Sequence, residues 1–225
     1  MRKIRVLIID DSTLARELLR SGLDADPRIE VAATAADVYA GRDRIVELRP
    51  DVVTLDIEMP GMDGVEFLRR LMPQFPIPVV IVSALAEPKA RVTLDALEYG
   101  AVDLVLKPSS KIGSNLDEMI EELKTKICTA AITDVSHWRH NTRTQKNGKR
   151  RRSIHVESTN RSVRVLTGTS DKVIAIGAST GGTVALRTMI EPLPTDIPGI
   201  VIVQHMPPVF TRMFAEKLNE TAAVE

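Results

Sequence analysis

The sequence contains few of the residues that build disulfides, aromatic cores or membrane spans. Its single cysteine, Cys128, permits neither an internal disulfide nor a thiolate metal site. Aromatic residues make up only 3% of the chain, so the core must consist of Ala, Val, Ile and Leu, as in α/β proteins. The longest apolar run, Val79–Ala86, is far shorter than the roughly 20 residues that a membrane-spanning helix needs. Met1–Lys3 leads into a strand-like run without a signal-peptide cleavage site, so we expect a soluble, cytoplasmic protein with no membrane insertion.

Net charge is absent overall but not locally. The 30 Lys and Arg residues balance 30 Asp and Glu residues, so the charge of the whole chain indicates no particular partner. Residues 1–108 carry 14 basic and 18 acidic side chains, residues 109–168 carry 12 and 6, and residues 169–225 carry 4 and 6. With a length of 225 residues, these shifts predict one complete domain, a basic connecting segment and part of a second domain.

The first segment alternates short apolar runs with amphipathic stretches such as Leu14–Leu23 and Val65–Met72. The apolar runs are rich in β-branched residues and are bounded by turn residues, which is typical of buried strands. They are Ile4–Ile9, Val31–Thr34, Val52–Leu55, Val79–Val82 and Leu104–Leu106. Five such repeats predict a parallel sheet with helices on both faces. Ligands of such sheets bind at the carboxyl ends of the strands.

Polar residues suited to phosphate and metal stand at those carboxyl ends. Asp10 and Asp11 follow the first run, Asp56 the third, Ser83 the fourth and Lys107 the fifth. Taken singly, each has a simple structural explanation, because Asp10, Asp11 and Ser12 could cap the next helix and a lysine at a strand end is usually solvated. Their occurrence at one edge of one sheet instead predicts a single site.

The chemistry of that site explains the combination. Three converging carboxylates repel one another, and a hard divalent cation such as Mg²⁺ relieves the repulsion. Asp56 could then attack phosphorus as a carboxylate nucleophile, while Lys107 and the Ser83 hydroxyl contact the phosphoryl oxygens. The tight turn 59–64 would let the backbone carbonyl of Glu58 reach the metal. The expected product is an aspartyl phosphate.

Residues 1–125 resemble the receiver domain of two-component response regulators. The motifs that carry the resemblance are Asp10-Asp11, Asp56 with the turn Met-Pro-Gly-Met-Asp-Gly at 59–64, Ser83-Ala84, Gly-Ala-Val-Asp at 100–103 and Lys107-Pro108. The resemblance implies a flavodoxin-like (βα)5 fold, Asp56 as phosphoacceptor with Mg²⁺, and a histidine kinase as phosphodonor. Leu104 stands where receivers commonly carry the Tyr or Phe whose ring changes position on phosphorylation.

Residues 126–168 are expected to form a basic flexible linker after a helix at Leu116–Cys128. Arg139–Arg152 contains seven Lys or Arg residues and no acid, a pattern that can bind nucleic acid. The run lacks interleaved aromatic residues, and no helix-turn-helix pattern follows it, so a solvated linker is the preferred interpretation over a nucleic-acid arm. His137 and His140 have no second ligand pair that would complete a metal site.

Residues 169–225 restart the α/β pattern and place a serine at a strand-to-helix turn. The strand Val173–Ile176 leads into Gly-Ala-Ser-Thr-Gly-Gly at 177–182, which has the G-x-S-x-G context of an exposed nucleophile, here Ser179. Backbone N–H groups at the helix start could stabilise an oxyanion. The alternative, a phosphate-binding glycine loop, fits neither G-x-G-x-x-G nor the P-loop pattern.

His205 directly follows the next strand, Ile200–Val203. Successive parallel strands are usually neighbours about 5 Å apart, so Ser179 and His205 should emerge at the same sheet edge. A lone histidine at a strand end is more often structural, but beside a nucleophile turn a general base is favoured.

With the receiver motifs, the 177–182 turn and Gln-His-Met-Pro at 204–207 resemble the chemotaxis response regulator protein-glutamate methylesterases. The resemblance implies that Ser179 attacks glutamyl methyl esters on methyl-accepting chemotaxis receptors, that His205 transfers the proton, and that particular glutamines are deamidated. Thr180 is implied to lie beside the nucleophile. It further implies that the unphosphorylated receiver covers the active site until a chemotaxis histidine kinase phosphorylates it.

The family continues beyond the position at which this chain stops, and that further stretch supplies the Asp of the triad. The acids after Ser179 are Glu191, Asp196, Glu216, Glu220 and Glu225. None follows a third strand, so none is assigned to the triad. We expect a truncated first part of a doubly wound parallel α/β catalytic domain with very weak activity. Alternatives are a phosphorylation-dependent binding module with a vestigial hydrolase segment and, less in keeping with the sequence, a transcriptional regulator.

Overall fold

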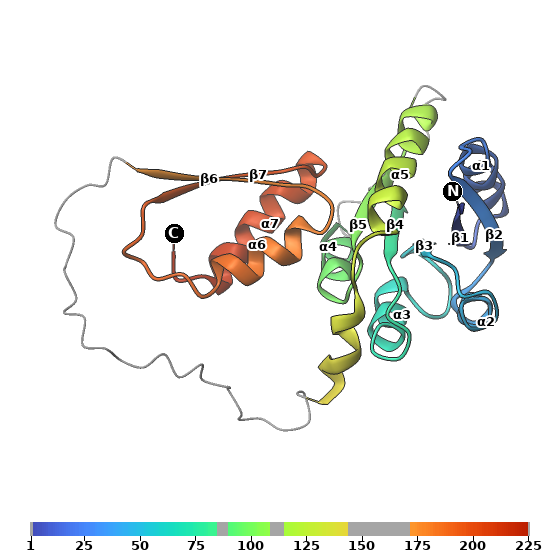
Figure 1. Ribbon diagram of the computed structural model, residues 1–225, viewed down its shortest axis with the longest axis horizontal. Helices are drawn as coiled ribbons and strands as arrows, with labels where there is room; N and C mark the ends of the chain where they lie inside the picture. The colour runs from blue at the N-terminus through green and yellow to red at the C-terminus, as the bar shows by residue number, and fades with distance from the viewer. Residues whose placement is uncertain (1, 85–89, 109–114, 144–171, 225) are drawn as a thin grey trace.

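The N-terminal half of the protein is built around a five-stranded parallel sheet. The computed structural model describes residues 2–84, 90–108, 115–143 and 172–224, and Figure 1 shows their arrangement. The sheet has the order β2-β1-β3-β4-β5, and every neighbouring pair is parallel. The strands are β1 (Ile4–Ile9), β2 (Ile29–Ala35), β3 (Val52–Leu55), β4 (Val79–Ala84) and β5 (Asp103–Lys107).

Helices cover both faces of this sheet, as the sequence predicts. The helices are α1 (Thr13–Asp24), α2 (Val38–Leu48), α3 (Gly64–Leu71), α4 (Ala90–Glu98) and α5 (Leu116–Ala130). Helix α1 contacts α5 on one face, while on the other α2 contacts α3 and α3 contacts α4. The sheet and the two helix layers give three layers in all. Strands β1, β3 and β4 lie in the middle of the sheet with helices on both sides, and this explains why their residues are almost all apolar.

Side-chain caps set the helix starts beside the sheet. Ser12 caps α1 by accepting a hydrogen bond from the backbone of Ala15, and Asp63 caps α3 in the same way from Glu66. Such caps satisfy backbone donors that would otherwise be unpaired. Of the three residues considered as caps after the first strand, Ser12 is therefore the one that caps α1, while one carboxylate oxygen of Asp10 accepts from the Ser12 backbone N–H at 2.9 Å.

The connecting segment is ordered further than expected at its start. Helix α5 continues to Ala130, two residues beyond the expected helix, and a 3-10 helix, η2, covers Ser136–Arg143 within the segment expected to be a flexible linker. Trp138 on η2 lies against the receiver, where a Cβ placed on Gly100 would be 3.1 Å from its ring. The basic run beyond residue 143 lies outside the described residues. Within the described part of the chain, no helix is both long and apolar enough to cross a membrane.

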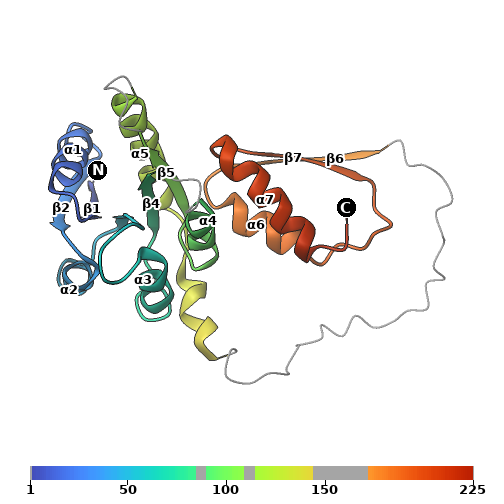
Figure 2. The same ribbon diagram turned by 180° about the vertical axis from the view of Figure 1, so that it is seen from behind.

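The C-terminal segment forms a second, two-stranded parallel sheet. Strands β6 (Val173–Ala178) and β7 (Gly199–Gln204) pair in register, and helices α6 (Gly182–Ile190) and α7 (Pro208–Thr221) cover one face. Figure 2 shows the same side-by-side packing of α6 and α7 below the strands. None of the described residues covers the opposite face, where Val173, Val201 and Val203 are each more than half exposed.

Candidate functional site

Three carboxylates meet at the carboxyl edge of the five-stranded sheet. Asp10 and Asp56 are buried, with 1% and 4% of their surface exposed, while Asp11 is exposed. One oxygen from each lies within 4.8 Å of the others. Oxygen ligands at this spacing suit a hard divalent cation. The structure thus brings together the three acids that the sequence predicts to meet.

The backbone holds the two buried acids in place. The Asp10 N–H donates to the Ala35 carbonyl at 3.1 Å, and the Asp56 N–H donates to the Ile9 carbonyl at 2.9 Å, so each acid extends the sheet ladder by one residue. One carboxylate oxygen of Asp56 accepts from the backbone N–H of Glu58 at 2.9 Å. This leaves the second oxygen of Asp56 for other partners.

Lys107 bridges the two buried carboxylates. Its Nζ lies 2.7 Å from Oδ2 of Asp10 and 2.6 Å from Oδ2 of Asp56. Burial lowers the pKa of Lys107, but the hydrogen bonds with the two carboxylates outweigh burial and raise the pKa above its ordinary value. Lys107 is therefore cationic at neutral pH and sits where the oxygens of a phosphoryl group on Asp56 would need a positive charge.

The turn after Asp56 keeps the backbone close to the carboxylates. The N–H groups of Met59 and Gly64 both donate to the Ile57 carbonyl at 3.1 Å. A Cβ on Gly64 would lie 2.7 Å from the backbone oxygen of Asp56, so the start of α3 can approach this closely only with glycine. Glu58 is half-buried beside the acids, and its backbone carbonyl as a metal ligand stays a prediction.

Ser83 lies within β4, one residue before the strand ends, and is 1% exposed. Its hydroxyl is 3.4 Å from the hydroxyl of Thr93, which is buried on α4. Leu104, on β5, is also buried, at 2% exposure. Because it is a leucine, this position of β5 has no aromatic ring. Sequence reasoning missed Thr93, because a single threonine in an amphipathic helix gives no signal until the sheet places it beside Ser83.

Ser179 and His205 emerge side by side at the carboxyl edge of the second sheet. Ala178 pairs with Gln204 in the last register position, and the His205 N–H donates to the Ala178 carbonyl at 2.9 Å. Gly181 adopts a positive φ of 75°, which lets the chain turn directly into α6. Both side chains are exposed, and among the described residues no hydrogen bond joins the Ser179 hydroxyl to the His205 ring.

Thr180 follows the serine and is half-buried. A narrow crevice separates this turn from the receiver. Its lining comprises Leu97, Val102, Asp103, Leu104, Ser179, Gly181, Thr183, Gln204, His205 and Met206. The Gly181 N–H donates to the receiver's Val102 carbonyl at 3.0 Å. Asp103 is the acid that shares the crevice with His205, but its carboxylate pairs with Lys126 at 3.0 Å.

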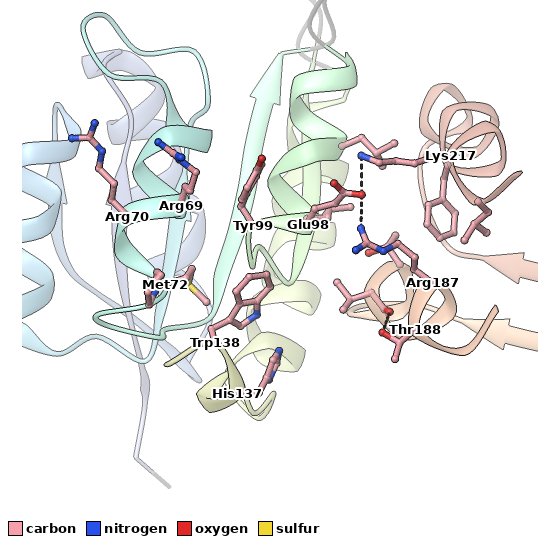
Figure 3. A pocket seen from close by; sticks show the side chains of 17 residues that line it. Arg69, Arg70, Met72, Glu98, Tyr99, His137, Trp138, Arg187, Thr188 and Lys217 are labelled. Carbon is pink, nitrogen blue, oxygen red and sulfur yellow. Dashed lines mark hydrogen bonds and ion pairs between the residues drawn. The ribbon is translucent and has the colours of Figure 1, made fainter. Parts of the chain in front are cut away.

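Ion pairs join α4 to the helices of the second unit. Arg187 on α6 lies 2.6 Å from Glu98, and Lys217 on α7 lies 2.8 Å from both Glu98 and Asp95. Figure 3 shows Arg187 and Lys217 reaching Glu98. The three side chains line a cavity of about 640 Å³. The cavity also contacts Trp138 on η2. These pairs could not be predicted from the sequence, because their members are about 90–120 residues apart.

The fold and the acidic edge define a class: a parallel α/β domain with three aspartates and one lysine at the carboxyl edge of its sheet. Residues 6–124 match the model of the response regulator receiver domain, which is more than half of the chain. The protein therefore belongs to the response regulator receiver domain family. Residues 174–225 match a second model, that of the CheB methylesterase.

Relatives with both parts support the same arrangement. The chain is 53% identical over 224 residues to the "Protein-glutamate methylesterase/protein-glutamine glutaminase" of Syntrophotalea carbinolica, covering 100% of this chain and 61% of that protein. A protein of the same name from Sulfurimonas denitrificans is 47% identical, and the match covers 99% of this chain and 61% of that protein. The chain thus spans about three fifths of these relatives.

A solved structure supports the receiver fold directly. The response regulator domain of Thermotoga maritima CheB is 40% identical, with a TM-score of 0.54, and the match covers 59% of this chain and 99% of that one. The share of this chain that it covers corresponds to the first sheet and its helices. The comparison does not extend to the sheet that carries Ser179 and His205.

Proposed function

We propose that the protein is the regulatory part and the first catalytic part of a chemotaxis protein-glutamate methylesterase controlled by phosphorylation at Asp56. One observation carries the proposal. The same chain places a three-aspartate, one-lysine edge on one sheet and a serine turn beside a histidine on the next, with the two edges linked through α4 and β5. The names of the two relatives are consistent with this reading.

Phosphorylation begins with Oδ2 of Asp56, the carboxylate oxygen that pairs with Lys107 before phosphorylation. Asp10, Asp11 and Asp56, with the backbone carbonyl of Glu58, would hold Mg²⁺, which supplies charge neutralisation for the anionic donor when bound. The Asp56 carboxylate attacks phosphorus, a P–O or P–N bond to the donor breaks, and an acyl phosphate forms. Lys107 moves with its charge from the carboxylates to the new phosphoryl oxygens, and Ser83 donates its hydroxyl to one of them. The phosphodonor is a histidine kinase of the chemotaxis system.

Ester hydrolysis uses Ser179 and His205 in sequence. His205 accepts the proton as Ser179 Oγ attacks the carbonyl carbon of a glutamyl methyl ester, and returns it to methanol as the C–O bond breaks. Water then hydrolyses the acyl-enzyme to glutamate. Replacing methanol with ammonia as the leaving group gives glutamine deamidation by the same steps. The substrate side chains lie on methyl-accepting chemotaxis receptors.

The contact between the two units supports control by the receiver. The Val102 carbonyl accepts a hydrogen bond from the N–H of Gly181. This N–H lies at the start of α6, where it would otherwise be available to donate to an oxyanion. The crevice at Ser179 and His205 is narrow because receiver residues form one of its walls. A substrate peptide therefore needs the units to separate, and phosphorylation at Asp56 is the trigger.

Two assays test the proposal. Incubation with acetyl phosphate and Mg²⁺ should add one phosphoryl group by intact-mass analysis, and Asp56→Asn or chelation should abolish it. Methanol release from methylated receptor should be far greater when the chain is extended by the remaining portion of the S. carbinolica relative, and Ser179→Ala should remove it. Undiminished labelling of Asp56→Asn would overturn the phosphorylation step. Release that survives Ser179→Ala would overturn the hydrolase step.

A second candidate is a phosphorylation-dependent binding module without hydrolysis. The absence of a hydrogen bond between the side chains of Ser179 and His205 in the described structure favours it. The methanol assay separates the two, because a binding module would bind receptor and release no methanol in either the original or the extended chain.

A further inference from the structure

The side chain of Gln204 connects the two loops that carry Ser179 and His205. Gln204 is the last residue of β7. Its Nε2 donates to the Ser179 carbonyl at 2.9 Å and to the His205 carbonyl at 3.2 Å. One amide group thus holds the backbone of the proposed nucleophile and that of the proposed base.

These two bonds fix the orientation of the amide. Both acceptors are carbonyl oxygens, so only the NH₂ group of Gln204 can face them. Its Oε1 is then turned away, is buried, and has no hydrogen-bond partner among the described residues. A buried acceptor without a donor costs free energy. The orientation is retained because the two donated bonds impose it.

The start of α6 makes room for this side chain. A Cβ on Gly182 would lie 2.1 Å from Oε1 of Gln204 and 2.7 Å from Cβ of Ala178. A side chain at position 182 would therefore push Gln204 out of this orientation and would also meet Ala178.

Backbone pairing does not replace the Gln204 link. The bond from the His205 N–H to the Ala178 carbonyl is the last one between the backbones of the two strands. The Ser179 carbonyl accepts within its own loop from Gly182 at 2.7 Å. Among the described residues, Gln204 is thus the group that ties Ser179 to the loop after β7.

We propose that Gln204 is a positioning residue that keeps Ser179 and His205 at a fixed separation without touching the reacting atoms. The inference rests on the proposed serine–histidine chemistry and adds the residue that aligns it. Losing the link frees the two loops to move independently, which slows attack by Ser179.

The test uses the 225-residue chain and two substitutions of Gln204. Gln204→Met keeps the length of the side chain and removes the donor. Gln204→Glu presents an acceptor to two carbonyls at neutral pH, but its protonated form can donate one hydrogen bond. The matched control is Gln74→Met, because Gln74 also donates one Nε2 hydrogen bond to a backbone carbonyl, that of Arg70 at 2.9 Å, outside the site.

Two readouts separate positioning from folding. The first is amide hydrogen exchange at His205 and Gly182, measured by NMR. The second is the rate constant for modification of Ser179 by a fluorophosphonate probe, measured by mass spectrometry. Gln204→Met should exchange faster and react more slowly, each by about tenfold or more, as expected for two lost hydrogen bonds. The control should match wild type. The exchange rate of Gln204→Glu divided by that of wild type at the same pH should fall as pH is lowered, because the carboxyl gains a proton that it can donate.

Each outcome decides one question. If Gln204→Met matches wild type in both readouts, Gln204 is not a positioning residue. Equal losses in the Gln74→Met control would also overturn the inference, because they would show a general loosening. A wild-type chain whose Ser179 does not react, with the exchange difference intact, would support the link between the loops and overturn the proposed nucleophile. If Gln204→Met does not fold, the pH series of Gln204→Glu alone decides whether donation to the carbonyls matters.

Discussion

Replacing Glu98 with glutamine should loosen the contact between α4 and the second sheet unit. The Glu98 carboxylate pairs with Arg187 at 2.6 Å and with Lys217 at 2.8 Å. The side chains of the three residues are 30%, 40% and 26% exposed, so solvent screens both pairs. Exposed pairs contribute about 0.2–1 kcal/mol each. Losing both should therefore cost about 1 kcal/mol and shift the opening equilibrium about fivefold.

Trp138 provides a direct assay for this opening. It is the single tryptophan of the chain and lines the cavity between the two units, where Figure 3 shows it below Tyr99. Collisional quenching by acrylamide should be stronger in Glu98→Gln than in wild type. Raising the ionic strength should bring wild type toward the variant, because salt screens exposed ion pairs.

The control for this experiment is Glu216→Gln. Glu216 pairs with Arg212 at 2.9 Å within α7, so the substitution removes a comparable ion pair that does not join the two units. Its quenching should match wild type. If Glu98→Gln and wild type are quenched equally at every salt concentration, the ion pairs do not hold α4 against the second unit, and the reasoning fails.

Three further predictions concern the receiver. Gly64→Ala should destabilise the fold by about 1–3 kcal/mol in urea unfolding, because the new Cβ would lie 2.7 Å from the Asp56 carbonyl; an unchanged midpoint would contradict this contact. Lys107→Met should cost about 3–5 kcal/mol by leaving the buried carboxylates of Asp10 and Asp56 unpaired, and Mg²⁺ should restore more stability to the variant than to wild type. Two arginines of α3 hold the pKa of Glu66 at about 2, below its ordinary 4.5. Glu66 therefore stabilises the fold above about pH 4.5, and the stability advantage over Glu66→Gln should vanish as pH falls toward about 2.

The receiver sheet could be predicted from local pattern because its strands are buried on both faces. The bounds of β1 and β3 agree with the expected runs Ile4–Ile9 and Val52–Leu55. Each of these runs is apolar except for one residue, Arg5 or Thr54, and is followed directly by an aspartate. The other strands extend by one or two residues beyond the apolar runs, since ladder hydrogen bonds also include flanking residues such as Asp103. The meeting of Asp10, Asp56 and Lys107 then follows from the parallel order of the strands.

Long-range contacts explain what the sequence could not predict. The 3-10 helix η2 lacks apolar periodicity, and its Trp138 packs beside Gly100 of the receiver. The link from Gln204 to Ser179 depends on the register of β6 with β7. No local pattern encodes either contact. Sequence reasoning therefore named the residues that we propose to carry the chemistry and missed the residues that hold them in place.

Helix α4 connects the two sites through opposite faces. Its buried Thr93 lies 3.4 Å from the Ser83 hydroxyl beside the acidic edge, and its partly exposed Glu98 pairs with α6 and α7. In the proposed regulation, a phosphoryl group on Asp56 draws the Ser83 hydroxyl toward itself and away from Thr93. Because Leu104 has no ring that could change position, the proposal assigns the sensing of phosphorylation by α4 to this hydroxyl contact. In the same proposal a shift of α4 acts on Glu98 directly, since Thr93 and Glu98 belong to one helix.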